Sequence, residues 1–456
     1  MTGLREVQLE KLNPFFVCRE RVMTNLEFVR MYYDGDPQHE WERLERHRTE
    51  AAITWRVLEQ YLPVPPAGVL DCGVGPGRYA IQLAQRGYAV TLFDLSSENL
   101  AYARRQAQAA GVRLQAYDLG DATDLGRYGD ESFEAVLLMG PLYHLLEVEQ
   151  RQQALQEARR VLRPGGTLFA AFINRYAGHI QAAIRDPLLP LKDAENSIKL
   201  LHTGKLTPEG VRPGGFIAYM AHPTEVGALI WSAGFEHLET LSLEGLVGGY
   251  EGEVNALQGA AWDTWLEINW HVARDPSLFG ASQHLLAVAR RPRWRMVLRK
   301  LAGELGQAGI RCTVTGSANL ALHGVPVAVK DVDLEMSAEE AQRFQKRYAG
   351  KAILPVALRQ DEHYRSFFGR YEIEGVIVEV MGDLQRRERG SWKPTANTHL
   401  EQLDLEGVAV QAAWLEEETL ANLRRGRRER AALCLPYCDQ ERLAGLLTRR
   451  IATNVI

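Results

Sequence analysis

The stretch that decides the fold of the first half of the chain is Gly68-Val69-Leu70-Asp71-Cys72-Gly73-Val74-Gly75-Pro76-Gly77. Its apolar start predicts a buried strand, which ends in a carboxylate and turns directly into three glycines. Glycines at such a turn let the backbone approach a ligand closely and let the next helix pack tightly on the strand. A dinucleotide-binding loop needs Gly-x-Gly-x-x-Gly, but Arg78 occupies the position three after Gly75. The even spacing therefore indicates a nucleoside cofactor without a pyrophosphate.

Beyond this loop, short apolar runs alternate with amphipathic segments. We expect strands and intervening helices in turn, with strands at 69–70, 88–93, 113–117, 133–138, 167–173, 237–243 and 283–288, and helices at 79–85, 98–110 and 149–162. Alternation of this length predicts a doubly wound α/β fold, a parallel sheet with helices on both faces. A helix is expected over 40–62, within a helical N-terminal lid of residues 1–66. Residues 175–235 and 245–282 show no strong period and are expected to be insertions that shape a substrate site.

Two carboxylates stand where the second and third strands are expected to end. Asp94 lies 17 residues after Gly77, at a position where a carboxylate can accept hydrogen bonds from both hydroxyls of a ribose. Asp121 follows the third strand, at the adenine end of the same site. Because ligands of parallel α/β sheets bind outside the carboxyl ends of the strands, we expect both side chains beside the nucleoside.

The glycine stretch, Asp94, Gly120-Asp121-Ala122 and the run Arg-Val-Leu-Arg-Pro-Gly-Gly at 160–166 resemble the class I S-adenosylmethionine-dependent methyltransferases, over about residues 40–290. The resemblance implies a Rossmann-like methyltransferase sheet with S-adenosylmethionine as its cofactor. It places the glycine loop against the methionine part, and the two aspartates at the ribose and the adenine. The residues assigned to the cofactor are Tyr33, Asp71, Gly73, Gly75, Gly77, Asp94, Leu95, Asp121, Ala122 and Met139. The alternative is an α/β domain that binds a nicotinamide or no cofactor.

The run after the fourth strand, at 139–144, reads Met-Gly-Pro-Leu-Tyr-His. It differs from the Asp/Asn-Pro-Pro-Tyr run of many amino-group methyltransferases of nucleic-acid bases, which disfavours base methylation. His144 and its neighbour Tyr143 are the candidate catalytic residues, since an imidazole titrates near neutral pH and can act as a general base. The alternative is that both side chains only form a wall of the cofactor pocket.

Aromatic and basic residues extend the expected site. Tyr32, Tyr33 and Trp41 could form an aromatic lid over the sulfonium, where cation–π attraction is available. Trp41 suits packing in a helix core equally well. Arg175 follows the fifth strand, at the edge where α/β sheets bind ligands, and is the candidate for contact with an anionic group of the substrate.

A second signature begins at Gly316-Ser317, between an expected strand at 311–315 and an expected helix at 318–322. The free N–H groups at a helix N-terminus suit a phosphate. Lys330, further along, could touch a phosphate or simply be exposed.

Three acidic residues follow this glycine. Asp331 and Asp333 begin 14 residues after Ser317, on a strand expected at 331–335, where period two places both carboxylates on one face. Glu379 supplies a third carboxylate from a strand expected over 371–380. Carboxylates in this arrangement suit Mg²⁺ ions that hold a nucleoside triphosphate.

These residues resemble the nucleotidyltransferase superfamily related to DNA polymerase β, in particular its small antibiotic-modifying and minimal members. The resemblance covers about residues 294–456 and implies a C-terminal α/β nucleotidyltransferase-like domain that transfers a nucleoside monophosphate to a hydroxyl and releases pyrophosphate. It makes Asp331, Asp333 and Glu379 catalytic residues and metal ligands, with Gly316 and Ser317 at the triphosphate. The alternative is that the carboxylates are solvated strand ends and a capping acid.

Arginines crowd the run 423–430, near the end of a helical tail. The run could bind a triphosphate or RNA. Such runs are more often solvated helix faces with i,i+4 partners, and we favour that interpretation.

Length and composition limit the class of protein. A chain of 456 residues predicts two or three domains, and the basic, proline-bearing run 290–293 divides it into residues 1–292 and 293–456. A net charge of −5 gives no electrostatic reason to expect nucleic-acid or membrane binding. The chain shows no apolar stretch of about 18 residues and no signal-peptide pattern. Five scattered cysteines favour a reducing cytoplasm over a disulfide framework.

The two signatures together predict a bifunctional enzyme. We expect methyl transfer from S-adenosylmethionine to a small molecule, and Mg²⁺-dependent transfer of a nucleotide from a nucleoside triphosphate to a hydroxyl-bearing small molecule such as an antibiotic. A shared small-molecule target would explain why both are joined. Two alternatives stay open: a methyltransferase with a non-catalytic binding or regulatory module, and a tRNA-modifying enzyme that uses the arginine-rich run.

Overall fold

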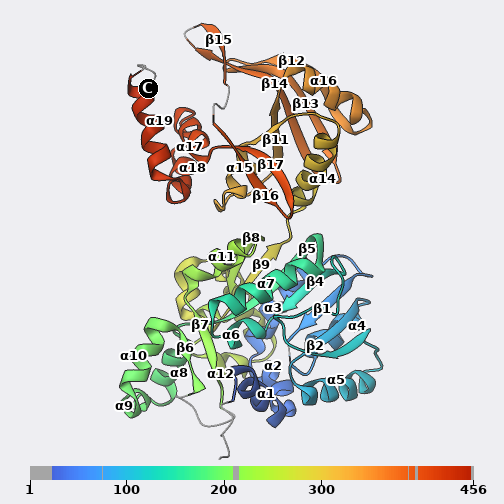
Figure 1. Cartoon of the computed structure of the whole chain (residues 1–456). Helices are drawn as coiled ribbons and strands as arrows, with labels where there is room; N and C mark the ends of the chain where they lie inside the picture. The colour runs from blue at the N-terminus through green and yellow to red at the C-terminus, as the bar shows by residue number, and fades with distance from the viewer. Residues whose placement is uncertain (1–22, 74, 209–214, 389, 396–398, 453–456) are drawn as a thin grey trace, which may run out of the picture.

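The computed structural model describes residues 23–73, 75–208, 215–388, 390–395 and 399–452. Two bodies follow one another along the chain, and each is built on its own sheet (Figure 1). Cys18 and Val74 lie outside the described residues. None of the helices in the described ranges is both long and apolar enough to cross a membrane.

The first sheet confirms the doubly wound α/β prediction. Its strands are β1 (Gly68–Cys72), β2 (Ala89–Asp94), β3 (Ala116–Leu119), β4 (Phe133–Leu138), β5 (Leu162–Asn174), β8 (Glu236–Ser242) and β9 (His284–Arg290). The first five run parallel in the order β3-β2-β1-β4-β5, and β9 then pairs antiparallel with both β5 and β8. Because β1 is central, the glycine loop after it lies in the middle of the carboxyl edge.

Helices cover both faces of this sheet. Successive strand residues face opposite sides, so Val69 packs in one core cluster and Leu70 in the other. The cluster of Val69 is closed by α3 (Arg48–Tyr61), α4 (Arg78–Gln85) and α5 (Ser97–Ala109), and that of Leu70 by α7 (Val148–Val161) and α11 (Pro223–Ser232). Removal of these apolar faces from water is the main force that holds the sheet and helices together.

The helix expected over 40–62 is in fact two helices. α2 (Pro37–Arg46) and α3 are separated by His47, whose backbone leaves the helical region at φ −109° and ψ 58°. The His47 imidazole lies 2.8 Å from the carboxylate of Glu251, a partner 204 residues away that no local pattern can indicate. α1 (Asn25–Gly35) and α2 both contact α5, beside the carboxyl edge of the sheet (Figure 1).

Residues 175–235 and 245–282 contain more regular structure than expected. β7 (Ala218–Ala221) pairs in parallel with the end of β5, and β6 (Lys205–Leu206) pairs with β7. The interpretation of these stretches as pure insertions is wrong for these strands and for α11, because elements so short carry no periodic signal. The other helices of this half are α6 (Pro141–His144), α8 (Ala177–Arg185), α9 (Leu189–Lys192), α10 (Ala194–Thr203), α12 (Glu251–Asn255) and α13 (Gly259–Val272).

The second sheet has the order β12-β13-β14-β11-β10-β17-β16, with β15 paired to β14. Its strands are β10 (Thr313–Thr315), β11 (Asp331–Met336), β12 (Ala352–Gln360), β13 (Tyr364–Ile373), β14 (Val376–Glu388), β15 (Ser391–Pro394), β16 (Leu400–Leu405) and β17 (Val408–Ala413). The helices are α14 (Arg293–Gln307), α15 (Gly316–Leu322), α16 (Ala338–Arg347), α17 (Leu415–Arg424), α18 (Arg428–Cys434) and α19 (Gln440–Ala452). Val332 and Leu334 pack in the core with α14 and α16, which leaves Asp331 and Asp333 on the opposite face of β11.

The strand expected over 371–380 is a hairpin of β13 and β14. Glu374 and Gly375 form its turn with φ of +50° and +75°, and Ile373 pairs with Val376 across it. Two consecutive residues in the left-handed region suit the tight turn of a hairpin. Glu374 and Gly375 interrupt the apolar residues here, so the glycine was a turn signal that the expected single strand overlooked.

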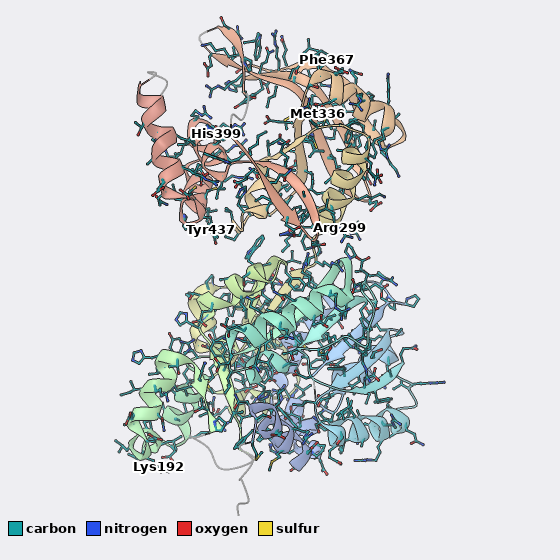
Figure 2. The ribbon with its side chains drawn as sticks, in the orientation of Figure 1. Lys192, Arg299, Met336, Phe367, His399 and Tyr437 are labelled. Atoms are coloured by element: carbon teal, nitrogen blue, oxygen red, sulfur yellow. The ribbon has the colours of Figure 1, made fainter. Side chains whose placement is uncertain are left out.

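An ion pair joins the two bodies close to the chain connection. Arg159 of α7 pairs with Glu406, which lies in the turn between β16 and β17. Arg299 of α14 lies 3.6 Å from the other oxygen of the same carboxylate (Figure 2). The exposed turn that carries Glu406 therefore contacts one arginine from each half of the chain.

Candidate functional site

The glycine loop after β1 adopts a backbone that other residues rarely tolerate. Gly73, Gly75 and Gly77 have φ of +73°, +66° and +78°, in the left-handed region. A Cβ on Gly140, at the end of β4, would lie 1.8 Å from the carbonyl oxygen of Gly73. The loops after β1 and β4 are therefore in direct backbone contact, and glycine is required on both sides.

Asp94 at the end of β2 holds this loop in place. Its carboxylate accepts hydrogen bonds from the Gly75 amide at 3.1 Å, the Ser96 amide at 2.8 Å and the Asn99 side chain at 3.3 Å. Asp94 is only 4% exposed. Burial raises the pKa of Asp94 to about 7, although the three hydrogen bonds favour the charged form. The position of the carboxylate is thus fixed before any ligand binds.

Asp71, the last acid before the glycines, is fully buried. Neither of its carboxylate oxygens has a hydrogen-bond partner at ordinary geometry among the described residues. Burial, and then the nearby Asp94, raise the pKa of Asp71 well above its usual range. A buried acid in this state is uncommon, and a cationic ligand beside the loop would favour its charged form.

A pocket lies at this edge of the sheet, with about 670 Å³ of space between its walls, open solvent included. Of the residues assigned from the sequence, it is lined by Tyr33, Gly73, Gly75, Asp94, Leu95, Asp121, Ala122, Met139, Tyr143 and His144. Asp71 and Gly77 do not line it. A Cβ on Gly77 would instead lie 2.9 Å from the Leu92 side chain, in the core behind the loop.

His144 is a neutral, buried histidine in this pocket. Its Nδ1 donates to the carbonyl oxygen of Ile217 at 2.8 Å, because a carbonyl can only accept. Its Nε2 therefore accepts from the Tyr33 hydroxyl, at 2.7 Å. Burial lowers the pKa of His144 to about 4 and raises that of Tyr33 well above its usual range. The imidazole is thus a weak base whose lone pair is engaged by Tyr33, and acid–base chemistry here would pass through the Tyr33 hydroxyl.

Arg43 also lines the pocket, a residue that the sequence gave us no reason to select. Its guanidinium donates to Glu40 at 3.0 Å and to both oxygens of Glu50 at 2.7 and 2.9 Å. Burial would raise the pKa of Glu50, but Arg43, and then His284, lower it to about 2. Burial likewise raises the pKa of Tyr143, a second hydroxyl of the pocket, in the field of the same charges. Arg43 thus enters the pocket wall already paired with Glu40, which also lines the pocket, and with Glu50.

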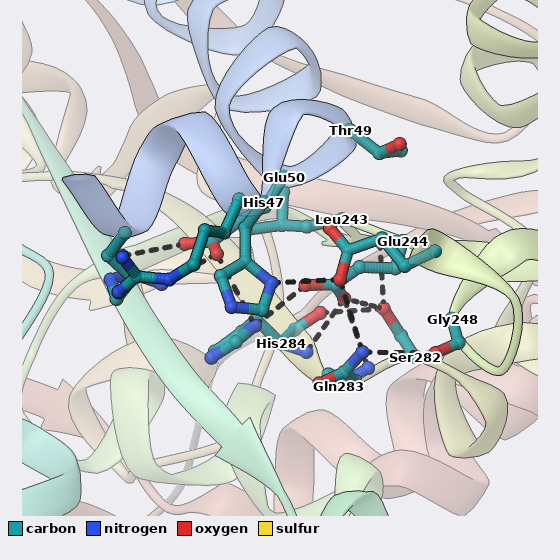
Figure 3. A network of polar contacts seen from close by, with 12 residues as sticks. His47, Thr49, Glu50, Leu243, Glu244, Gly248, Ser282, Gln283 and His284 are labelled. Carbon is teal, nitrogen blue, oxygen red and sulfur yellow. Dashed lines mark hydrogen bonds and ion pairs between the residues drawn. The ribbon is translucent and has the colours of Figure 1, made fainter. Parts of the chain in front are cut away.

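Figure 3 shows how this network continues to His284 at the start of β9. The Nδ1 atom of His284 lies 2.7 Å from Glu244 and 3.7 Å from Glu50. Burial opposes the imidazolium, but Glu50 and Glu244 outweigh it and raise the pKa of His284 to about 9. Candidate metal-ligand atoms of these three residues lie within 4.8 Å of one another, closer than any other such group in the described chain. Since Arg43 and the Gln283 amide already bond the two carboxylates, we interpret the group as a satisfied charge cluster.

Two residues expected at the site have structural roles instead. Arg175 is buried and donates to Glu225 at 3.0 Å and to the Met220 carbonyl at 2.9 Å, so it ties β5 to β7 and α11. The prediction that Arg175 meets a substrate is wrong. Trp41 packs against Tyr102 outside the pocket, as the alternative of core packing predicted.

In the second sheet, the predicted residues converge on one cleft with about 2500 Å³ of open space. Gly316 and Ser317 begin α15, directly after β10, and Asp331 and Asp333 lie on β11. Glu379 lies on the neighbouring β14, opposite Asp333 in register. Gly316 has φ of +66°, and a Cβ there would lie 2.0 Å from Oδ2 of Asp333. The glycine therefore makes room for the carboxylate.

The three carboxylates repel one another. Burial, and then Asp331 and Glu379, raise the pKa of Asp333 to about 7. Glu379 is balanced by Arg370, whose guanidinium lies 2.6 Å away across the β13–β14 pair. Divalent cations bind sets of carboxylate oxygens and offset their repulsion, but the oxygens of these three carboxylates do not all lie within 4.8 Å of one another.

Two further carboxylates belong to this cleft region and were missed in the sequence. Glu418 of α17 is buried, has a raised pKa caused by burial, and accepts a hydrogen bond from the Gly316 amide at 2.7 Å. Glu335 follows Asp333 by two residues on the same strand face, and burial, then Glu418, raise its pKa to about 7. The period-two pattern could have revealed Glu335. Nothing local pointed to Glu418.

The arginine-rich run is not one helix face, and that interpretation was wrong. Gly426, with φ of +72°, ends α17, and α18 begins at Arg428. The Arg427 amide donates to the Asn422 carbonyl at 2.9 Å and the Gly426 amide to the Leu423 carbonyl at 3.0 Å, a pattern that closes a helix through a left-handed glycine. The bend brings four of the arginines to the cleft, which are Arg424, Arg425, Arg427 and Arg430.

Residues 69–166 match the family model of the methyltransferase domain. A ubiquinone biosynthesis O-methyltransferase from Methylocella silvestris is 36% identical over 120 residues, or 26% of this chain and 44% of that protein. A tRNA 5-carboxymethoxyuridine methyltransferase from Escherichia coli is 34% identical over 131 residues, or 27% and 48% of the two chains. Among solved structures, a putative nucleotidyltransferase from Thermotoga maritima is 32% identical over 35% of this chain and 96% of its own, with a TM-score of 0.29.

The chain thus spans about half the length of the curated relatives it matches. It carries a class I S-adenosylmethionine-dependent methyltransferase domain, which contains the glycine loop and the carboxyl edge of the first sheet.

The protonation state of His144 can be measured directly. In ¹⁵N-histidine-labelled protein, we expect the His144 ring, assigned by its loss in His144→Gln, to be neutral with the proton on Nδ1 from pH 5 to 8. Its titration should be centred near pH 4, because burial disfavours the imidazolium. A midpoint near 6.5, the value of an unperturbed imidazole, would contradict the geometry described above.

The His284 cluster predicts a pH-dependent stability. A histidine whose folded pKa of about 9 exceeds its unfolded value near 6.5 stabilises the fold fully below pH 6.5, and this contribution is lost as the pH rises through 9. Thermal unfolding midpoints of the wild type should therefore fall over this window relative to those of His284→Gln. His271→Gln, which removes an exposed histidine of α13, should follow the wild type. Parallel curves for the wild type and His284→Gln would rule out the charged cluster.

Proposed function

We propose that the first half of the chain transfers a methyl group from S-adenosylmethionine, bound in the pocket at the carboxyl edge of the first sheet. The observation that carries this proposal is the left-handed glycine loop held by Asp94 beside that pocket. When bound, the cofactor supplies a methyl group on a sulfonium, which a nucleophile can displace. The match of residues 69–166 to the methyltransferase domain supports the same activity.

Each part of the pocket has a proposed task. The glycine loop receives the methionine part, Asp94 accepts the ribose hydroxyls, and Asp121 with Ala122 serves the adenine. Asp121 is fixed for this by the amide and hydroxyl of Thr123, at 3.0 and 2.7 Å. A site whose carboxylates are already in position binds its ligand with less loss of conformational freedom.

The acceptor that we propose is a small molecule with a hydroxyl group. The Tyr33 hydroxyl, whose proton points to His144, can accept a hydrogen bond from that hydroxyl. The acceptor oxygen forms a bond to the methyl carbon as the carbon–sulfur bond breaks, and the acceptor proton leaves to solvent. Holding the two reactants in line can contribute about 7–11 kcal/mol to the rate. The similarity to an O-methyltransferase agrees with an oxygen acceptor.

The cofactor site is tested by binding of S-adenosylmethionine, measured by titration calorimetry. Asp94→Asn removes a charged acceptor at the ribose and loosens the glycine loop, so the affinity should fall by about 10- to 100-fold. Asp118→Asn is the matched control, since Asp118 lies on the adjacent β3, bonds Tyr128 at 2.7 Å, and does not line the pocket. Equal affinities of the two variants for S-adenosylmethionine would show that Asp94 does not contribute to the cofactor site.

For the second half, residues 293–456, we propose Mg²⁺-dependent transfer of a nucleoside monophosphate to a hydroxyl. The convergence of Asp331, Asp333 and Glu379 in one cleft beside Gly316 carries this proposal. Mg²⁺, when bound, neutralises charge on the phosphates. The acceptor oxygen forms a bond to the α-phosphorus, the bond from that phosphorus to pyrophosphate breaks, and the acceptor proton passes to a carboxylate of the site.

The alternative for this half is a non-catalytic module, and titration with Mg²⁺ and ATP separates the two. Wild type should bind the Mg²⁺·nucleotide, and Asp331→Asn/Asp333→Asn should bind it at least about tenfold more weakly, because the metal loses two charged ligands. Glu372→Gln removes an exposed carboxylate from the neighbouring β13 outside the cleft and should change nothing. No binding by the wild type would favour the module.

A further inference from the structure

The cleft of the second sheet is wide and extends well beyond its carboxylates. The space between its walls is about 2500 Å³, open solvent included, against about 670 Å³ for the pocket at the first sheet. The carboxylates of β11 and β14 line only part of it. The remaining walls come from the ends of β12 and β13, the far half of β14, and the bend between α17 and α18. This shape leaves room for a second, extended ligand.

Positive charge dominates these remaining walls. The cationic residues that line the cleft are Lys330, Arg359, Arg365, Arg386, Arg387, Arg424, Arg425, Arg427 and Arg430. Arg386 is paired with Glu388, whereas Arg359, Arg387 and Arg427 are exposed. The whole chain has a net charge of −5, so this is a strong local departure. A cationic acceptor would be repelled here, and a polyanion would be attracted.

Aromatic rings lie between these cations. Tyr364 lines the cleft, accepts a hydrogen bond from Arg425 at 2.9 Å, and has that guanidinium 5.3 Å from its ring centre. Trp392 of β15 lies outside the lining of the cleft, and the guanidinium carbons of Arg365 and Arg387 are 5.1 and 6.0 Å from its ring centre. Basic grooves with interleaved aromatic rings are typical of sites for single-stranded nucleic acid, where the cations follow the phosphates and bases stack on the rings.

The bend at Gly426 selects which arginines take part. Arg424, Arg425 and Arg427 line the cleft, but Arg428, the first residue of α18, does not. Arg427 and Arg428 are both exposed arginines, but only Arg427 lines the cleft. This difference provides a matched pair of variants.

We propose that the cleft binds a single-stranded nucleic acid, whose terminal sugar hydroxyl is the acceptor for the nucleotidyl transfer proposed above. The sugar–phosphate chain lies along the arginine wall, and its end reaches Asp331, Asp333 and Glu379. The acceptor role depends on the proposed nucleotidyl transfer, whereas strand binding does not. RNA and DNA share this backbone chemistry, and the experiment compares both.

The test uses the full chain and fluorescence anisotropy of a labelled strand of about 12 nucleotides, as RNA and as DNA, without nucleotide or Mg²⁺. Wild type should bind, and its affinity should fall steeply between 50 and 200 mM salt, because cations that contact phosphates release counterions. Arg387→Ala/Arg427→Ala should bind at least about tenfold more weakly, with a salt slope reduced by about 2. Arg428→Ala should match the wild type. Tighter binding of RNA or of DNA identifies the natural strand.

Three outcomes would overturn the inference: no strand binding by the wild type, binding that salt does not weaken, or equal losses for Arg427→Ala and Arg428→Ala. Glu372→Gln should retain strand binding, since Glu372 lies outside the cleft. Transfer is followed separately, with a nucleoside triphosphate labelled at the α-phosphate and the same strands. Binding of Mg²⁺·ATP without strand binding would refute this inference alone, and strand binding without transfer would refute the proposed nucleotidyl transfer alone.

Discussion

A buried carboxylate that accepts the amide N–H of a left-handed glycine is the constraint on which both sites depend. In the first sheet Asp94 bonds Gly75, and in the second Glu418 bonds Gly316. Both acids are buried, and burial raises the pKa of each, because a carboxylate loses favourable hydration away from water. At each site, the fold therefore places the glycine loop in direct contact with a buried carboxylate. A positively charged ligand beside either acid would favour its ionised form and so offset the cost of burying the charge.

The parts of the fold that were predictable are those in which a local pattern repeats. Apolar runs of the right length located the parallel strands, and the glycine spacing located the loop, because backbone geometry at Gly73 and Gly75 admits little else. The misses share a cause. The break at His47 coincides with a contact to Glu251, and the hairpin turns on two left-handed residues, Glu374 and Gly375, between two apolar runs. These features are set by tertiary contact or by single dihedral angles, which periodicity does not report.

The same division applies to the sites. Residue types with fixed spacing, such as Asp331 and Asp333, were found from the sequence, but their environment was not. His144 suggests a general base as an isolated imidazole, whereas burial and the Tyr33 hydroxyl make it a weak one. The Arg43 network joins helices of the lid to the first residue of β9, so no window of sequence contains it. Overall net charge was equally uninformative, because an average over the chain hides the basic wall of one cleft.

The path of the chain between the two sites bears on why they are joined. β9 starts beside the carboxyl end of β5, where His284 pairs with Ile173, and ends beside its beginning, where Arg290 pairs with Thr167. A seven-residue strand covers about 20 Å, so the second body leaves from the edge opposite to the methyl-transfer pocket. The lining of that pocket falls within residues 26–145, and that of the cleft within 316–430, so neither described site borrows residues from the other half. A small substrate would have to leave one site to reach the other. The two linings therefore give no geometric support to a shared small-molecule target.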